Sequence, residues 1–254
     1  REKSSSIRHP PVMNTGSKKG VIFVMQFRRT SALLLALVML ISLTLTGCGK
    51  KEPPIPGDQV AEAMADILVK NDVSKAMEVF GYTDEAEVRS NWGIDGDSIY
   101  TDEVVDELVS EFSNMGYKAT AEEIRVITDA FSKLYKGIEF TARVKVADEE
   151  TGVAVVTCTV NTVDSEAFTQ AMLDAASELD PDLLAEGDME DIYGQILYIA
   201  AANISEIKST GRTVDYDVDF ELSTVEICGK IRQVWVPKDA KEFGFQLTYH
   251  FTAG

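Results

Sequence analysis

The stretch Ile138-Glu139-Phe140-Thr141-Ala142-Arg143-Val144-Lys145-Val146 places an apolar side chain at every second position. Successive side chains of a strand point to opposite faces, so this alternation predicts a half-buried antiparallel strand. A turn sequence follows at 148–152, and the weaker alternation of 153–163 indicates a second, central strand. The sheet is therefore expected to start as a hairpin near the middle of the chain.

Helical patterns flank this hairpin on both sides. Before it, apolar residues recur at helical spacing over 58–136. Within that region, Thr120 and Glu123 have the spacing of a capping box, which predicts the start of a helix. After the hairpin, helices are expected over 165–179 and 189–208. The second of these is almost wholly apolar and is expected to be well buried.

Three further strands are expected in the last part of the chain. Residues 214–222 alternate apolar with acidic side chains, 227–236 form the next apolar stretch, and 243–251 place five apolar side chains on one face. Helices that are segregated from an antiparallel sheet define the α+β class. The sequence thus predicts a single α+β domain over 58–254, with a helical N-terminal half packed on an antiparallel sheet of about five strands.

The N-terminal region has the layout of an export signal. Residues 1–24 are polar and basic and are interpreted as a segment upstream of the true start at Met25. Two arginines then precede an apolar run over 32–41, which is shorter than a ~20-residue membrane span and typical of a signal peptide covering 25–47. The proline-rich residues 48–57 disfavour a helix and are expected to form a semi-rigid tether.

The signal ends in the four residues Leu45-Thr46-Gly47-Cys48. They resemble the lipobox of bacterial lipoproteins, in which the cysteine is lipidated and becomes the first mature residue. The resemblance implies that the signal peptidase recognises Leu45, Thr46 and Gly47. It also implies that lipid at Cys48 holds the protein on the extracytoplasmic face of the cell membrane, as two or more acyl chains give a stable anchor. The alternative is a small buried cysteine that follows an apolar helix.

The charge balance excludes one class of partner. The chain has 254 residues with 24 basic and 42 acidic side chains, a formal charge of −18. A nucleic-acid-binding protein needs a cationic surface, so nucleic acid is excluded as a partner. Residues 48–254 carry −24, and 151–200 contain no lysine or arginine. This acidity indicates either solvation or attraction for cations and basic peptides, in a body that anionic lipid headgroups repel.

Beyond the lipobox, three segments resemble lipid-anchored lipoproteins of Gram-positive bacteria that carry a nuclear-transport-factor-2-like or cystatin-like domain. They are the run Lys70-Asn71-Asp72-Val73-Ser74-Lys75-Ala76, the strand pair over 138–163, and Val234-Trp235-Val236 in a late strand. The resemblance implies a curved sheet cupped around a helix layer, often with a pocket in the cup. Several of these families have no known function, so the resemblance implies no particular chemistry.

Few residues qualify as candidate site residues. Cys158 and Cys228 both fall in expected strands of an exported protein, and either a disulfide between them or two free thiols is compatible with the sequence. His250 is expected on the polar face of the last strand, without catalytic partners. Six aromatic side chains either line a pocket or fill the core: Trp92, Tyr100, Phe112, Tyr117, Tyr193 and Tyr198.

An acidic stripe on the strand over 214–222 raises the question of metal binding. Its members are Asp215, Asp217, Asp219 and Glu221. Alternate residues of a strand lie roughly 6.6 Å apart and point in parallel, so one strand alone cannot form a calcium cage. Pairing with Arg143 and Lys145 of a neighbouring strand is as consistent with the pattern as cation binding. No metal site and no cofactor is predicted.

These observations predict an extracytoplasmic, lipid-anchored lipoprotein that acts as a binding or interaction module. Its partners are the membrane, through lipid at Cys48, and an unknown small ligand, peptide or envelope protein. The alternative is an extracellular hydrolase with a carboxylate pair as acid and base. A structural envelope protein is a third possibility. An apolar cup favours binding, whereas carboxylates that converge in a wet cleft favour the enzyme.

Overall fold

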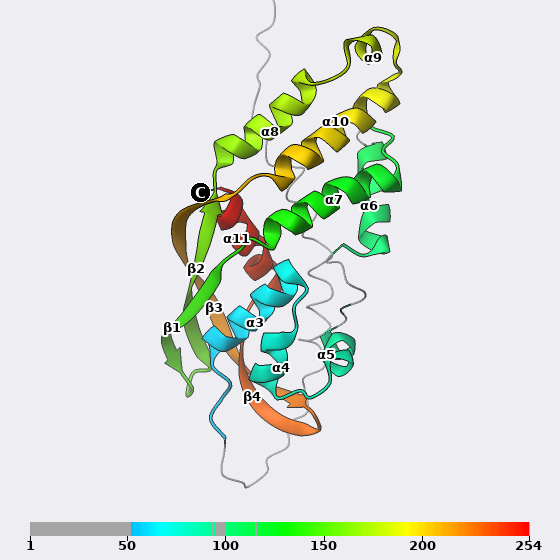
Figure 1. The fold of residues 1–254 in the computed structure, drawn as a ribbon. Helices are drawn as coiled ribbons and strands as arrows, with labels where there is room; N and C mark the ends of the chain where they lie inside the picture. The colour runs from blue at the N-terminus through cyan, green and yellow to red at the C-terminus, as the bar shows by residue number, and fades with distance from the viewer. Residues whose placement is uncertain (1–51, 93, 95–99, 115, 254) are drawn as a thin grey trace, which may run out of the picture.

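The computed structural model describes residues 52–92, 94, 100–114 and 116–253 (Figure 1). It has the expected α+β character, with helices packed on an antiparallel sheet. Its helices are α3 (Gly57–Lys70), α4 (Ser74–Phe80), α5 (Glu85–Trp92), α6 (Asp102–Asn114), α7 (Ala121–Tyr135), α8 (Ser165–Ser177), α9 (Pro181–Glu186), α10 (Met189–Ser205) and α11 (Ala240–Thr252). Its strands are β1 (Phe140–Asp148), β2 (Val153–Val163), β3 (Ser209–Ile227) and β4 (Lys230–Pro237).

The sheet is an open antiparallel meander with the strand order β1-β2-β3-β4. Ala142 of β1 lies opposite Cys158 of β2, which in turn lies opposite Tyr216 of β3. β3 has 19 residues and serves two partners. Its first part pairs with β2, and its second part, from Phe220 onward, pairs with β4. The sheet thus has four strands in the described chain, not the five predicted.

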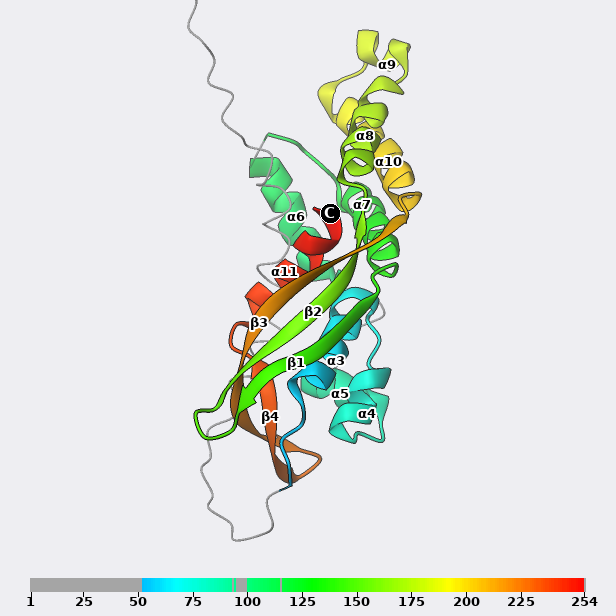
Figure 2. The same ribbon diagram turned by 90° about the vertical axis from the view of Figure 1, so that its left-hand side faces the viewer.

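One face of the sheet is covered by α3 and α11 (Figures 1 and 2). The other carries polar side chains such as Thr157 and Asp217, which alternate with buried residues along their strands. The core forms on the covered face around side chains such as Val156, Phe220 and Phe243. Gly57 begins α3 directly above the sheet, where a Cβ atom would lie 3.0 Å from a methyl group of Val156. Glu62 of α3 also accepts a hydrogen bond from the Ala142 amide at the open edge of β1, and such cover protects an edge strand from pairing with other chains.

The predicted strand over 243–251 is wrong, because these residues form helix α11. The side chain of Asp239 accepts hydrogen bonds from the amides of Lys241 and Glu242 and so starts the helix. The alternating apolar set also contains residues four apart. Phe243, Leu247 and Phe251 are fully buried, whereas Tyr249, from the same alternating set, is half exposed. The apolar pattern fits both the two-residue period of a strand and the four-residue spacing of a helix, and packing on the sheet selects the helix.

The strand predicted over 227–236 begins too early. Cys228 and Gly229 instead form the turn between β3 and β4, and both have left-handed φ angles of 50° and 72°. A glycine is favoured at such an angle because it has no Cβ atom. We call residues 228–232 the hairpin tip, because they contain this turn and the first residues of β4.

The helices α8, α9 and α10 connect β2 to β3 and form what we call the helical arm, residues 165–205. α10 packs between α7 and α8. The arm lies at the opposite end of the molecule from the hairpin tip and from the first described residues (Figures 1 and 2). α10 is less buried than predicted, since Ala200 and Ile204 are covered but Tyr198 is exposed.

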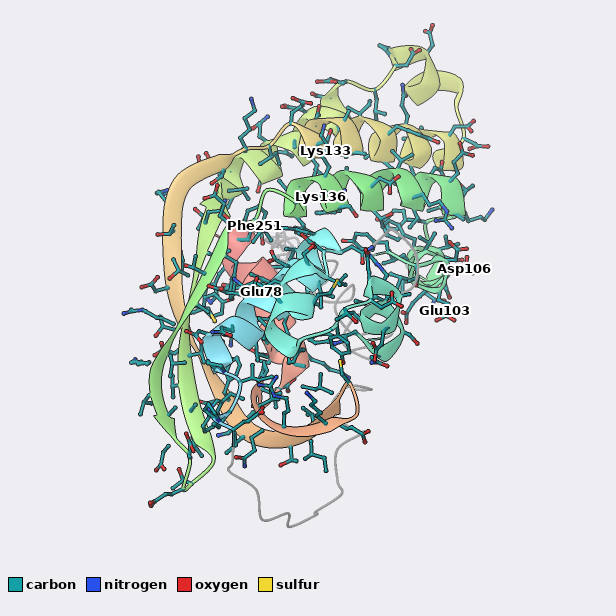
Figure 3. All side chains as sticks on the ribbon, turned by 60° about the horizontal axis from the view of Figure 1, so that its bottom comes forward. Glu78, Glu103, Asp106, Lys133, Lys136 and Phe251 are labelled. Carbon is teal, nitrogen blue, oxygen red and sulfur yellow. The ribbon has the colours of Figure 1, made fainter. Side chains whose placement is uncertain are left out.

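Charged side chains such as Glu103 and Asp106 of α6 project outward (Figure 3).

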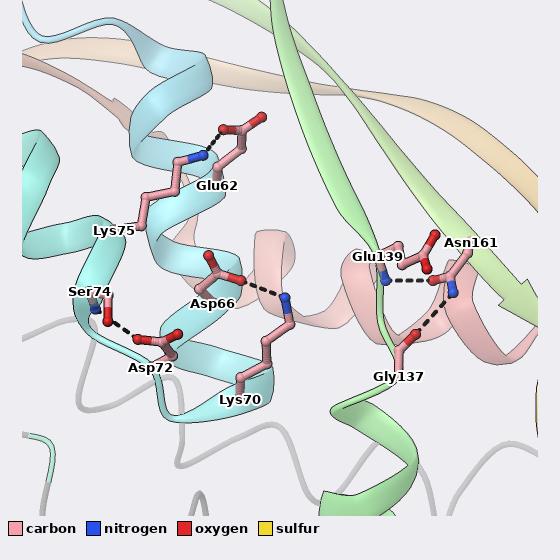
Figure 4. A network of polar contacts seen from close by, with 9 residues as sticks. All are labelled: Glu62, Asp66, Lys70, Asp72, Ser74, Lys75, Gly137, Glu139 and Asn161. Atoms are coloured by element: carbon pink, nitrogen blue, oxygen red, sulfur yellow. Dashed lines mark hydrogen bonds and ion pairs between the residues drawn. The ribbon is translucent and has the colours of Figure 1, made fainter.

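Asn161 of β2 fixes the junction between α7 and β1 (Figure 4). Its side-chain carbonyl accepts from the Glu139 amide at 2.8 Å, and its amide nitrogen donates to the Gly137 carbonyl at 3.0 Å. Asn161 is nearly fully buried. Both backbone groups lie where the chain leaves a helix and has not yet entered the sheet, so the side chain supplies the bonds that secondary structure would otherwise provide.

Candidate functional site

A pocket of about 350 Å³ lies between the helices α3, α4 and α5 and the end of the sheet that carries the β3–β4 hairpin. α3 contributes Val60 and Met64, and β4 contributes Val234 and Val236. All four of these side chains are buried. The lining is therefore mainly apolar, as is usual for sites that hold small ligands.

An aromatic cluster closes the helical side of this pocket. Phe80 at the end of α4 and Trp92 at the end of α5 have ring centroids 5.3 Å apart. Gly81 ends α4 with a left-handed φ of 76°, which lets the chain turn and brings Tyr82 to the pocket wall. The sulfur of Cys228 lies 3.8 Å from the Gly81 carbonyl. The hairpin tip and the α4–α5 connection thus meet at the pocket.

A small number of polar groups accompany this apolar surface. The Asn91 amide nitrogen lies 3.4 Å from the Tyr82 hydroxyl. A tyrosine hydroxyl is protonated at neutral pH, and burial raises the pKa of Tyr82 further, so this hydroxyl can donate a hydrogen bond. Ser223 also lines the pocket. Such groups orient a ligand whose main body is apolar.

Two carboxylates, Glu87 of α5 and Glu226 of β3, also line the pocket. Both residues are solvent-exposed. A carboxylic general acid is normally desolvated by burial. The pKa values of Asp72, Asp148 and Asp217 are lowered because hydrogen bonds stabilise their charged forms, which is the opposite of what an acid catalyst needs. These three carboxylates lie outside the pocket lining.

The predicted lipidation site lies outside the described residues. Cys48 and the three residues before it, Leu45, Thr46 and Gly47, all fall before the first described residue. Their role therefore rests on the sequence. Among the described residues, no helix is both long and apolar enough to cross a membrane.

Cys158 and Cys228 are both free thiols in the structure. Cys158 is buried on the covered face of β2, and burial raises the pKa of its thiol to about 12. Cys228 is exposed in the turn and not in a strand, contrary to the prediction. Cys158 lies opposite Tyr216 of β3. The chain from Tyr216 to Cys228 follows β3 over about 40 Å. The two cysteines are therefore too far apart for the disulfide that the sequence left open.

The acidic stripe of β3 is part of a polar network on the uncovered face of the sheet. Lys145 Nζ lies 2.6 Å from Asp217, which also accepts from the Thr157 hydroxyl at 2.7 Å. Arg143 lies 3.9 Å from Asp215. The expected pairing with β1 is confirmed, but β1 is not adjacent to β3, so these side chains reach across β2. Within the described chain, no group of three or more histidine, cysteine or acidic residues is arranged to hold a metal ion.

His250 lies on α11 and not on a strand. Its ring stacks on Tyr216 with centroids 4.5 Å apart, and burial lowers its pKa. A depressed folded-state pKa means that the unfolded chain binds the proton more readily. We expect the stability of the protein to fall as the pH drops below about 6.5, the unperturbed histidine value.

The His250→Gln variant removes this titration and tests its contribution. Unfolding in denaturant, measured from about pH 8 to pH 5, is expected to show that the wild type loses more stability than the variant below pH ~6.5. All other titrating groups are common to both proteins, so their effects cancel in the difference. Parallel profiles over the whole range would show that His250 is not desolvated.

The six aromatic residues from the sequence lie in different environments, since Tyr100 is buried, Tyr198 is exposed, and the others are pocket-lining or partly buried. Trp92 lines the pocket. Tyr117 packs edge to face against Tyr193 and joins the start of α10 to the end of α6 through Phe112. Sequence reasoning missed Tyr82, Val225 and the hairpin tip as pocket residues. The one local signal is the pair of aromatics on either side of Gly81, which places two rings at a turn.

The fold and the site define the protein as an α+β domain with an open four-stranded sheet and an apolar pocket at one end. No family model matches the chain, and no curated protein matches it. Among solved structures, that of a candidate lipoprotein, YcdA, from Bacillus subtilis is similar, with a TM-score of 0.49 and 13% identity. The similarity covers 76% of this chain and 56% of that one, so this chain spans about half the length of YcdA.

Proposed function

We propose that the protein is an extracytoplasmic lipoprotein, anchored by lipid at Cys48, whose domain binds a ligand with an apolar body. The pocket between α3–α5 and the β3–β4 hairpin is the observation that carries the binding role. A ligand that binds on the apolar floor would remove its own hydrophobic surface from water. The Tyr82 hydroxyl and the Asn91 amide offer hydrogen bonds at the pocket wall. The lipid anchor is supported by the sequence Leu45-Thr46-Gly47-Cys48 after an apolar run.

The proposal includes the resemblance to nuclear-transport-factor-2-like or cystatin-like domains of Gram-positive lipoproteins. An antiparallel sheet with α3 and α11 on one face supports it. The pocket at the end of the sheet is also compatible with the cup that these domains often carry. The ligand class does not follow from the resemblance, because one fold serves many functions.

Replacing Cys48 by alanine tests the anchor. We expect Cys48→Ala to move the protein from the membrane fraction to the soluble fraction, because the domain is acidic and its described helices do not span a membrane. Fractionation of cells that make either form measures this directly. Cys228→Ala, which removes an exposed thiol of the domain, is the control and should stay membrane-bound. A Cys48→Ala protein that remains in the membrane fraction would overturn the lipoprotein assignment.

Filling the pocket tests the binding role. Ser223 and Val225 line the pocket and are only partly buried, so a phenylalanine at either position would occupy ligand space. We expect Ser223→Phe and Val225→Phe to weaken binding of the apolar fluorophore N-phenylnaphthylamine by about tenfold or more, which corresponds to ~1.4 kcal/mol. Val146→Phe adds the same side chain at an exposed site on β1 outside the pocket and should bind normally.

The same proteins discriminate between binding and hydrolysis. Equal fluorophore binding by all of these proteins would show that the pocket does not take apolar ligands. Turnover on a panel of glycans and esters that is lost in Glu87→Gln and Glu226→Gln would favour the hydrolase instead. These two substitutions keep the shape of the rim but remove both carboxylates of the pocket lining.

A further inference from the structure

We propose that the hairpin tip faces the membrane that holds the lipid anchor and contacts its anionic phospholipid headgroups through Lys230 and Ile231. The acidic helical arm then points away from this surface. The inference rests on the anchor at Cys48 that is part of the proposed function. It adds an orientation and a protein surface with a defined partner, an anionic lipid bilayer.

The first argument is the attachment of the tether to the edge of β4. The Ile55 amide donates to the Gln233 carbonyl at 2.9 Å, and the Ile55 carbonyl accepts from the Trp235 amide at 3.2 Å. Ile55 is buried, and Glu52 lies 3.5 Å from Arg232. The chain from Cys48 to Ile55 therefore ends on β4 next to the hairpin tip.

The length of this tether limits the distance between the domain and the anchor. Ile55 lies seven positions after Cys48 in the sequence. A fully extended chain of that length spans at most about 25 Å. The edge of β4 must therefore stay within about 25 Å of the lipidated residue, whereas the helical arm at the other end of the molecule has no such restraint (Figure 1).

The second argument is the chemistry of the hairpin tip. Ile231 is 53% exposed and follows Lys230, while Glu226 of β3 lies opposite Ile231 and Glu52 pairs with Arg232, so Lys230 is the cation that the tip offers. No acidic residue occurs over 227–238, in a chain whose overall charge is strongly negative. An exposed aliphatic side chain next to a lysine suits the interface of an anionic bilayer, which attracts basic residues.

The third argument is the charge at the opposite end. The stretch 146–207, which includes the whole helical arm, contains no lysine or arginine. An anionic surface repels this end and attracts the tip, so both forces favour the same orientation. The pocket is lined by Cys228 and Gly229 of the tip. It therefore lies at the end of the domain that faces the membrane.

Site-specific quenching tests the orientation. The native Cys228 thiol is exposed, whereas Cys158 is buried and Cys48 carries the lipid in the anchored protein. A fluorophore on Cys228 of the lipidated protein, in phosphatidylglycerol vesicles with nitroxide-labelled lipid, is expected to be quenched at least twofold more than a fluorophore on the arm. The arm label uses Cys228→Ser with Leu173→Cys, because Leu173 of α8 is 59% exposed. Equal quenching, or stronger quenching on the arm, would overturn the inference.

Charge reversal tests the contact itself. Lys230→Glu and Ile231→Asp are each expected to reduce quenching of the Cys228 label about twofold in phosphatidylglycerol vesicles. For the wild type, replacing phosphatidylglycerol by phosphatidylcholine should reduce the quenching by a similar factor. Lys208→Glu, an equal charge change at the root of the arm, is the control and should leave it unchanged. Quenching that is insensitive to Lys230, Ile231 and lipid charge would overturn the headgroup contact.

The two levels of the proposal fail in different ways. If Cys48→Ala protein binds membranes like the wild type, the anchor is wrong and the inference fails with it. If the wild type is anchored and its Cys228 label is not selectively quenched, only the orientation is wrong.

Discussion

Phe243→Ala is expected to lower the free energy of unfolding by about 3–5 kcal/mol, the range for a large core aromatic. Phe243 is fully buried on α11, and its ring packs edge to face against Phe140 of β1 with centroids 6.1 Å apart. Removing the ring leaves a cavity between the helix and the sheet that neighbouring side chains fill only in part. Unfolding in denaturant, followed by circular dichroism, measures the loss.

Tyr249→Ala is the matched control, because it also removes an aromatic ring from α11. Tyr249 is 50% exposed, so we expect a loss of less than about 1 kcal/mol. The pair also distinguishes the helix from the predicted strand. In a strand, residues 243 and 249 would lie on one face and both substitutions would be costly. Similar losses for the two variants would contradict the helix.

Asn161→Leu is expected to destabilise the protein by about 2–4 kcal/mol, because it leaves two backbone groups without partners. These are the Gly137 carbonyl and the Glu139 amide at the α7–β1 junction. Leucine has the same number and branching of side-chain heavy atoms but no polar group, so the loss reports mainly the hydrogen bonds. The measurement is again the free energy of unfolding in denaturant.

Asn161→Asp should fall between the wild type and Asn161→Leu. It keeps the oxygen that accepts from Glu139 but loses the donor to Gly137. Thr159→Val, on the same strand, removes a hydroxyl that donates to Asp215 at an exposed site. We expect it to cost less than about 1 kcal/mol, since exposed partners exchange one hydrogen bond for another with water. A loss as large for Thr159→Val would argue against a special role of Asn161.

The parts of the fold that were predicted correctly have strong local signals. The capping box of Thr120 and Glu123 starts α7 as expected, with both reciprocal hydrogen bonds present. The alternation around Phe140 gives β1, although Val144 and Val146 are exposed where an irregularity interrupts the register with β2. In each case, residues a few positions apart determine the outcome.

The errors occur where a local pattern is compatible with two structures. The apolar residues from Phe243 to Phe251 satisfy both the period of a strand and the spacing of a helix, so only packing against the sheet decides. The pocket could not be predicted from such local patterns. It joins Val60 of α3 to Ala240 of α11, and these residues meet through the path of the whole chain.

The unbroken course of β3 makes it a spacer of fixed length. Its 19 residues have a contour length of about 60 Å. The root of the helical arm is attached at one end, through Ser209, and the pocket wall is formed at the other, through Ile227. No loop lies between them to absorb a displacement. The distance along the chain between the root of the arm and the pocket wall is therefore set by the geometry of a single strand.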